Sequence, residues 1–90
     1  MLIAKIKIVN KLGLHARAAA QLVKLASKFE SNIFLVREDE NTTADAKSIL
    51  SVLALAASKG VVLSLEVDGA DEVEAIRVVE QLFADGFGED

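Results

Sequence analysis

Two segments far apart in the chain alternate apolar side chains with polar or charged ones, and this pattern leaves few folds open. In residues 2–9 the apolar side chains alternate with two lysines, and residues 61–67 alternate in the same way. A period of two residues indicates a half-buried strand, with one row of side chains facing a core and the other facing water. Sheets with one packed and one solvated face are usually antiparallel. We therefore expect an antiparallel sheet with helices on one side.

Residues 10–44, the first part of the segment between these strands, predict one helix and two further strands. In residues 16–29 apolar side chains recur at steps of three and four, which is typical of an amphipathic helix, and the abundance of alanine raises the helix propensity. Residues 33–37 are β-branched or aromatic and predict a strand. A polar turn at 38–41 then leads to a short third strand at 42–44.

Two more helices complete the predicted order. Residues 48–57 are nearly all apolar and predict a short helix, with Ser48 suited to the N-cap and Gly60 as its stop. The last helix follows a turn at 68–69, carries acidic residues in its first turn and ends near Gly86. Its predicted core stripe is Val73, Ile76, Val79, Leu82 and Phe83.

The resulting order is β-α-β-β-α-β-α, in a single domain spanning residues 1–90. It predicts an α+β fold, an open-faced β-sandwich in which a four-stranded antiparallel sheet is covered on one face by three helices. We expect residues 88–90 to fray.

Composition excludes several classes of function. The chain has no cysteine, which removes disulfide and thiolate chemistry and favours a reducing compartment. No apolar run approaches the roughly 20 residues of a membrane span. One histidine and no cysteine leave too few ligands for a structural zinc site, and no glycine-rich phosphate loop is present. We expect a cytoplasmic protein with no metal, no cofactor and no membrane insertion.

Charge is unevenly distributed along the chain. Residues 1–29 contain six basic and no acidic residues, whereas residues 30–90 contain four basic and fourteen acidic ones. A basic patch on an acidic domain predicts a docking surface for an anionic partner. Nucleic acid is not the expected partner, because the chain has no tyrosine or tryptophan for base stacking.

The only histidine, His15, stands where the first helix begins, two residues before Arg17. The free N–H groups and dipole of a helix N-terminus form an anion site. A guanidinium binds phosphate oxygens in pairs, and a neutral imidazole is a competent nucleophile. These groups together suit a phosphoryl group attached to His15. The alternative is an ordinary histidine that only caps the helix.

Two segments carry a resemblance to a known family. The stretch N-K-L-G-L-H-A-R-A-A resembles the active-site signature of the histidine-containing phosphocarrier protein (HPr) family of the bacterial phosphoenolpyruvate-dependent phosphotransferase system. The stretch A-K-S-I-L-S-V-L-A-L-A-A-S-K-G resembles the second helix of that family. The resemblance implies a monomeric phosphocarrier rather than an enzyme. His15 would accept a phosphoryl group from phosphorylated Enzyme I and pass it to a histidine of Enzyme IIA, for sugar uptake, while Arg17 stabilises the phosphorylated state.

The resemblance also implies a docking face and a regulatory site. The implied docking residues are Ala20, Lys24, Lys28, Lys47, Leu50 and Leu53. For the two leucines, ordinary core packing is an equally good interpretation. Ser48 matches the serine that an ATP-dependent HPr serine kinase phosphorylates in some members, and a helix N-cap is the alternative.

The chain departs from the family pattern in two places. Ala18 stands where the family usually has proline, and replacement by proline is expected to preserve phosphoryl transfer. The turn at 38–43 is longer than in sugar-branch members, and with the ending F-A-D-G-F-G-E-D it resembles the nitrogen-related branch (NPr). Residues 47–49 are more similar to the sugar branch. A regulatory phosphocarrier of the nitrogen-related branch, acting through binding partners, is therefore the alternative function, and a plain interaction module is a third.

Overall fold

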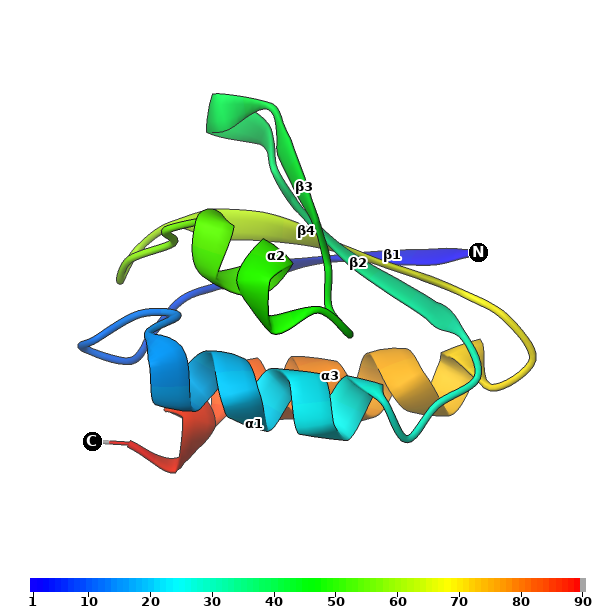
Figure 1. Cartoon of the computed structure of the whole chain (residues 1–90). Helices are drawn as coiled ribbons and strands as arrows, with labels where there is room; N and C mark the ends of the chain where they lie inside the picture. The colour runs from blue at the N-terminus through cyan, green and yellow to red at the C-terminus, as the bar shows by residue number, and fades with distance from the viewer. Residues whose placement is uncertain (90) are drawn as a thin grey trace.

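The computed structural model describes residues 1–89 and contains one four-stranded sheet (Figure 1). The strands are β1 (Leu2–Lys7), β2 (Asn32–Arg37), β3 (Thr42–Asp45) and β4 (Val62–Asp68). Their order in the sheet is β1-β4-β2-β3, and every neighbouring pair is antiparallel. Each predicted strand is present, with ends that differ from the prediction by one or two residues.

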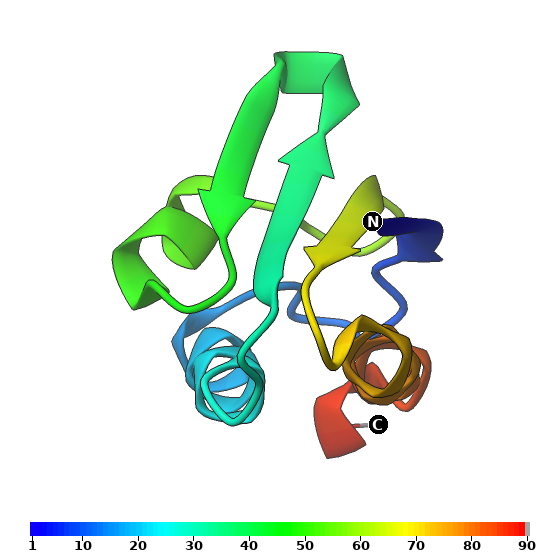
Figure 2. The ribbon, with the colours of Figure 1, turned by 90° about the vertical axis from the view of Figure 1, so that its right-hand side faces the viewer.

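Three helices lie on one side of this sheet. They are α1 (Ala16–Ala26), α2 (Ile49–Ala54) and α3 (Glu72–Ala84), with two short 3-10 turns, η1 (Glu38–Glu40) and η2 (Gly86–Gly88). Helices α1 and α3 run side by side below the sheet, and α2 lies against α1 near β3 (Figures 1 and 2). This confirms the predicted open-faced α+β arrangement. No helix within residues 1–89 is long and apolar enough to cross a membrane.

The inward row of the alternating strands forms the core, as predicted. On β4 the side chains of Leu63, Leu65 and Val67 are fully buried, while Val62 on the other face is half exposed. Phe83 of α3 packs edge-on against Phe87 with ring centroids 4.9 Å apart. The aromatic pair holds the η2 turn against α3.

The predicted core stripe of α3 is wrong at Val73, whose side chain is 71% exposed. The buried side chains of this helix are Ala75, Val79 and Phe83. Val73 lies in the first turn of α3 and faces solvent, so the buried face of the helix begins with the small Ala75. The predicted stripe contains only large apolar side chains, so it did not include Ala75.

The first two helices end earlier than the sequence predicts. α1 ends at Ala26 instead of Phe29, and α2 ends at Ala54 instead of Ala57. α2 ends because Ala56 adopts a left-handed conformation (φ 50°), so Gly60 is not the stop. Arg37 satisfies the free carbonyls there, since its Nη1 donates to the oxygens of Leu55 and Ala56 at 2.8 and 3.1 Å.

A tight loop connects β1 to α1 and is fixed to the segment after α2. Gly13 has φ 65°, and a Cβ at this position would lie 2.5 Å from the carbonyl oxygen of Ala57, so no other residue fits without a shift. The next residue, Leu14, is buried and donates its N–H to the same oxygen at 2.9 Å. The position of His15, which follows directly, is therefore fixed by the packing of this loop.

Replacement of Ala18 by proline tests the start of α1. The first intrahelical hydrogen bond is donated by the Ala19 N–H, to the His15 carbonyl at 2.8 Å, so the Ala18 N–H precedes the hydrogen-bonded ladder. We expect Ala18→Pro to raise the free energy of unfolding by about 0.4–1 kcal/mol, measured by urea denaturation, because proline restricts the unfolded chain.

Ala20→Pro is the matched control, since it removes an interior helix bond and should cost about 3 kcal/mol. The side chain of Ala18 is fully buried. A loss of roughly 1–3 kcal/mol in Ala18→Pro would show that the ring overpacks the core and would contradict the prediction.

The Asp71 carboxylate joins the start of α3 to the start of β2. It accepts hydrogen bonds from the backbone N–H groups of Glu30 and Ser31 and from the Ser31 hydroxyl. The Ser31 hydroxyl bond and the Glu30 N–H hold the pKa of this carboxyl below its usual value.

Acid should therefore weaken the fold through Asp71. Its pKa is lower in the folded chain than in the unfolded chain, so its stabilisation is complete above the unfolded value, about 3.9, and is lost as pH falls through the folded value. We expect Asp71→Asn to reduce stability at pH 7 and to flatten the pH dependence of the unfolding midpoint below pH 5. Glu74→Gln, on the exposed side of α3, is the control, and an equal effect in both variants would refute the assignment.

Candidate functional site

His15 occupies the N-cap position of α1, with extended backbone angles (φ −76°, ψ 178°). Its carbonyl accepts the first intrahelical bond, but its side chain makes no capping hydrogen bond. The imidazole is 25% exposed. The interpretation of His15 as a side-chain helix cap is therefore wrong, and the ring remains available for other chemistry.

The two ring nitrogens have different surroundings. Nε2 lies 2.5 Å from Oε2 of Glu89, whereas Nδ1 makes no hydrogen bond to any group among residues 1–89. An ionised carboxylate only accepts hydrogen bonds, so the ring hydrogen belongs on Nε2. The lone pair of a neutral ring then lies on Nδ1.

Glu89 is held in place by a second side chain. Its other oxygen, Oε1, accepts from Nδ2 of Asn10 at 3.0 Å, and the same Asn10 amide donates to the Gly13 carbonyl at 2.9 Å. The Asn10 hydrogen bond, together with His15 and Arg17, lowers the pKa of Glu89 from its usual value, which keeps it ionised. The expectation that residues 88–90 fray is wrong for Glu89, and Asp90 lies outside the described residues.

Arg17 lies in the first turn of α1, beside the same carboxylate. Its Nη2 is 3.4 Å from Oε2 of Glu89, and its side chain is 70% exposed. The contact is long and the guanidinium is solvated, so the ion pair is weak. The guanidinium is therefore free to turn toward another anion at little cost.

These groups together form an anion site beside a nucleophile. The N–H groups of the first turn of α1 have no intrahelical acceptors, and the helix dipole adds positive potential there. Arg17 adds a formal positive charge at the same end. An anion-binding helix terminus next to an imidazole suits transfer of a phosphoryl group.

The structure places the other predicted site residues along α1 and α2. Ala20 and Lys24 are exposed on α1 at helical spacing from Arg17, and Lys28 is exposed just after the helix ends. Lys47 is partly buried, and its Nζ donates to the Phe29 carbonyl at 2.7 Å. Its ammonium group is therefore tied to the end of α1.

The two leucines of α2 have different environments. Leu50 is 77% exposed, so core packing is the wrong interpretation for it. Leu53 is partly buried and packs against the core, which favours core packing there. Ser48 is the N-cap of α2, and its Oγ accepts the Ser51 N–H at 3.4 Å, which confirms the capping prediction.

Sequence reasoning missed four residues around this site. Leu12 and Ile49 are exposed apolar side chains, 62% and 40%, on the loop before His15 and at the start of α2. A bulky apolar residue inside a glycine-containing loop is a signal that could have found Leu12. Asn10 and Glu89 gave no such signal, because their contacts join positions more than 70 residues apart.

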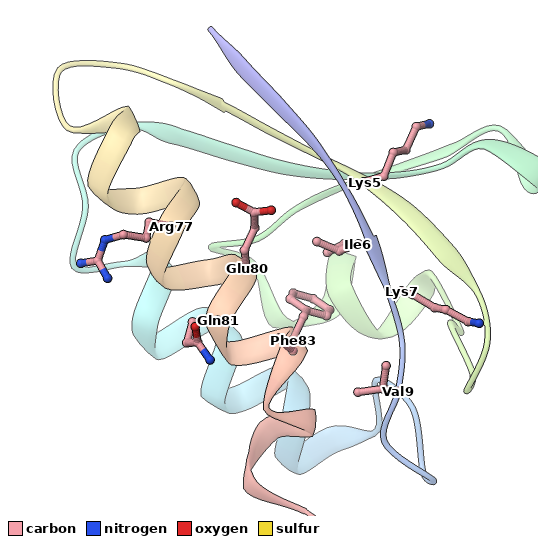
Figure 3. A pocket seen from close by; sticks show the side chains of 9 residues that line it. Lys5, Ile6, Lys7, Val9, Arg77, Glu80, Gln81 and Phe83 are labelled. Atoms are coloured by element: carbon pink, nitrogen blue, oxygen red, sulfur yellow. The ribbon is translucent and has the colours of Figure 1, made fainter.

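A separate pocket of about 450 Å³ lies between β1 and α3. Its lining combines the apolar Ile6, Val9 and Phe83 with charged side chains at the rim. Figure 3 shows that Lys5, Lys7 and Arg77 point away from this space. The pocket contains no part of the His15 cluster, and its basic groups do not converge on a common ligand.

The chain is similar to known proteins in sequence and in fold. A family model described as the PTS HPr component phosphorylation site matches residues 3–85. A phosphocarrier protein HPr from Neisseria meningitidis serogroup A is 46% identical over 89 residues, covering 99% of this chain and 98% of the relative. A phosphocarrier protein NPr from Klebsiella oxytoca is 42% identical over 85 residues, covering 94% and 93%. The crystal structure of HPr-C-His from Thermoanaerobacter tengcongensis matches with a TM-score of 0.94 and 43% identity, covering 100% and 99%.

Proposed function

This chain belongs to the HPr family of phosphotransferase-system phosphocarriers, and we propose that His15 accepts a phosphoryl group from phosphorylated Enzyme I and passes it to a histidine of Enzyme IIA. The observation that carries the proposal is the free Nδ1 of His15 at the N-terminus of α1. The chain is itself the covalent intermediate and returns unchanged after each cycle. We expect it to act in the cytoplasm as a monomer.

The proposed step needs no cofactor. The Nδ1 lone pair attacks phosphorus, and the bond between phosphorus and the Enzyme I donor breaks as the new P–N bond forms. In the second transfer the bond to Nδ1 breaks, and the Enzyme IIA histidine receives the phosphoryl group. Arg17, after it turns from Glu89, and the N–H groups at the start of α1 then stabilise the charge of the phosphoryl oxygens.

The proposed docking face is the exposed surface of α1 and α2 beside His15. It combines the basic residues Lys24 and Lys28 with the apolar residues Leu12, Ile49 and Leu50. Exposed apolar side chains ringed by charge are typical of protein interaction sites. The positive charge of α1 fits partners whose docking surfaces are acidic.

Ser48 is the proposed site of regulatory phosphorylation by an HPr serine kinase. It lies next to Ile49 and Leu50, so a phosphate there would place about two negative charges beside the docking face. Repulsion from an acidic partner would then weaken docking without a change of fold.

A regulatory role in the nitrogen-related branch is the second candidate function. Relatives named NPr match at 42% identity, close to the 46% of the HPr from Neisseria meningitidis, and the turn at 38–43, which contains η1, resembles that of the nitrogen-related branch. Transfer from sugar-branch Enzyme I, compared with transfer from nitrogen-branch Enzyme I under the same conditions, assigns the branch. Faster transfer from the nitrogen-branch enzyme would favour the second candidate.

His15→Ala tests the proposed acceptor. We expect the variant to incorporate no acid-labile phosphate from phosphoenolpyruvate and Enzyme I, because no other side chain of the chain is an imidazole. Ser48→Ala is the control and should incorporate phosphate as the unmodified chain does. Acid-labile phosphate in a folded His15→Ala variant would disprove the proposal.

Leu50→Ala tests the docking face. Loss of an exposed apolar contact at the centre of an interface costs roughly 1–2 kcal/mol, so we expect the KM of Enzyme I for this protein to rise about five- to thirty-fold. The thermal midpoint should not change, since Leu50 is 77% exposed. Val73→Ala, a comparably exposed apolar residue on α3, is the matched control. Equal KM values in the two variants would place the docking face elsewhere.

A further inference from the structure

The contacts of Glu89 extend the site beyond the predicted residues. We propose that Glu89 is a positioning residue for His15, which holds the imidazole in its Nε2–H form and presents the Nδ1 lone pair to the phosphoryl donor. The rate part of this inference rests on the proposed function, whereas its tautomer part concerns the resting protein alone.

Glu89 is placed by several independent contacts. Asn10 is only 2% exposed, and its amide links Oε1 of Glu89 to the Gly13 carbonyl. Just before Glu89, Phe87 is buried against Phe83, and its carbonyl accepts from Nε2 of Gln21 at 3.2 Å. The Glu89 side chain itself is 13% exposed. A carboxylate fixed in this way restricts the ring it contacts.

The hydrogen bond decides which nitrogen reacts. A neutral imidazole has one N–H and one lone pair, and a carboxylate at Nε2 favours the tautomer with the hydrogen there. Carboxylates fix the tautomer and orientation of histidines in the same way where the other ring nitrogen binds a metal. Here the corresponding position, Nδ1, makes no hydrogen bond to any group among residues 1–89.

The same contact serves the phosphorylated state. When phosphorus bonds to Nδ1 and the hydrogen stays on Nε2, the ring carries a positive charge, and the carboxylate stabilises it through a charge-assisted bond. When the P–N bond breaks, its electron pair returns to Nδ1 and the ring becomes neutral with the hydrogen still on Nε2. No proton has to move in either direction.

The charges around the ring come from few sources. Glu89 from the C-terminal segment and Arg17 from α1 meet at the ring, and the α1 N-terminus adds its dipole. Asn10 is neutral, and Lys11 and Lys59 on the neighbouring loops are exposed, with no ion pair to Glu89 within the described chain. Glu89 is thus the negative group that contacts the imidazole.

A rival role for Glu89 is a latch that occupies the phosphate position and must leave before transfer. The geometry favours positioning, because the carboxylate contacts Nε2 and leaves Nδ1 free. The two roles predict opposite effects on rate. Removal of a latch speeds phosphorylation, and removal of a positioning group slows it.

The test compares Glu89→Ala and Glu89→Gln with Asp85→Asn, an exposed acidic residue nearby, as the control. Ring ¹⁵N chemical shifts at alkaline pH report the tautomer of the unphosphorylated protein. We expect Glu89→Ala to gain a measurable population of the Nδ1–H form, Glu89→Gln to lie between, and Asp85→Asn to match the unmodified chain. With Enzyme I, Glu89→Ala should lower the maximal rate of phosphorylation roughly ten-fold at little change in KM.

An unchanged tautomer in Glu89→Ala, or a phosphorylation rate that stays equal or rises, would overturn the proposal. Thermal unfolding of each variant shows whether a lower rate comes from a damaged fold. If Glu89→Ala is destabilised, the tautomer and the rate of Glu89→Gln, which keeps the shape of the side chain, are used for the test instead. If the unmodified chain takes no phosphate while the tautomer still shifts in Glu89→Ala, the proposed function fails and the positioning role stands.

Discussion

The Gly13–Ala57 contact fixes the geometry on which the site depends. Gly13 approaches the Ala57 carbonyl so closely that no side chain fits between them, and Leu14 donates its N–H to the same oxygen. This joins the loop before α1 to the segment after α2, two regions more than 40 residues apart. Because His15 follows directly, its orientation depends on contacts from both halves of the chain. A site assembled in this way forms only when the whole sheet and helix layer have formed.

The electrostatics of the site depend on the same arrangement. The N-terminus of α1, Arg17 and the Asn10 amide supply positive potential or donors, and Glu89 is the acidic group among them. Its ionised state follows from these donors, which lower its pKa. The carboxylate thus offsets part of the positive potential while no phosphate is present, and its bond to Nε2 leaves the second ring nitrogen unoccupied.

The sequence predicted the fold well because periodicity and turns are local signals. The alternating strands, the amphipathic α1 and the Ser48 cap all follow from neighbours within a few residues. Errors arose where distant contacts decide. The end of α2 depends on Arg37, which lies on β2, and the burial of Ala75 in place of Val73 depends on how α3 packs against the rest of the fold. The His15–Arg17 pair was predictable because the two residues stand only two positions apart in the sequence. Glu89 was not predictable, because its partners lie 72 to 79 residues away.

The weakness of the Arg17 contact suits a carrier. A buried guanidinium held by several carboxylates would cost several kcal/mol to redirect, because an unpaired buried charge is left behind. Arg17 is 70% exposed and meets Glu89 at 3.4 Å, so its pairing is weak and can be exchanged for a phosphoryl oxygen at little cost. The same exposure limits how tightly Arg17 can hold the phosphoryl group. A phosphoryl group that is accepted and then passed on requires contacts that can be broken again at little cost. The imidazole, in contrast, is positioned by a well-ordered group, the Glu89 carboxylate at Nε2.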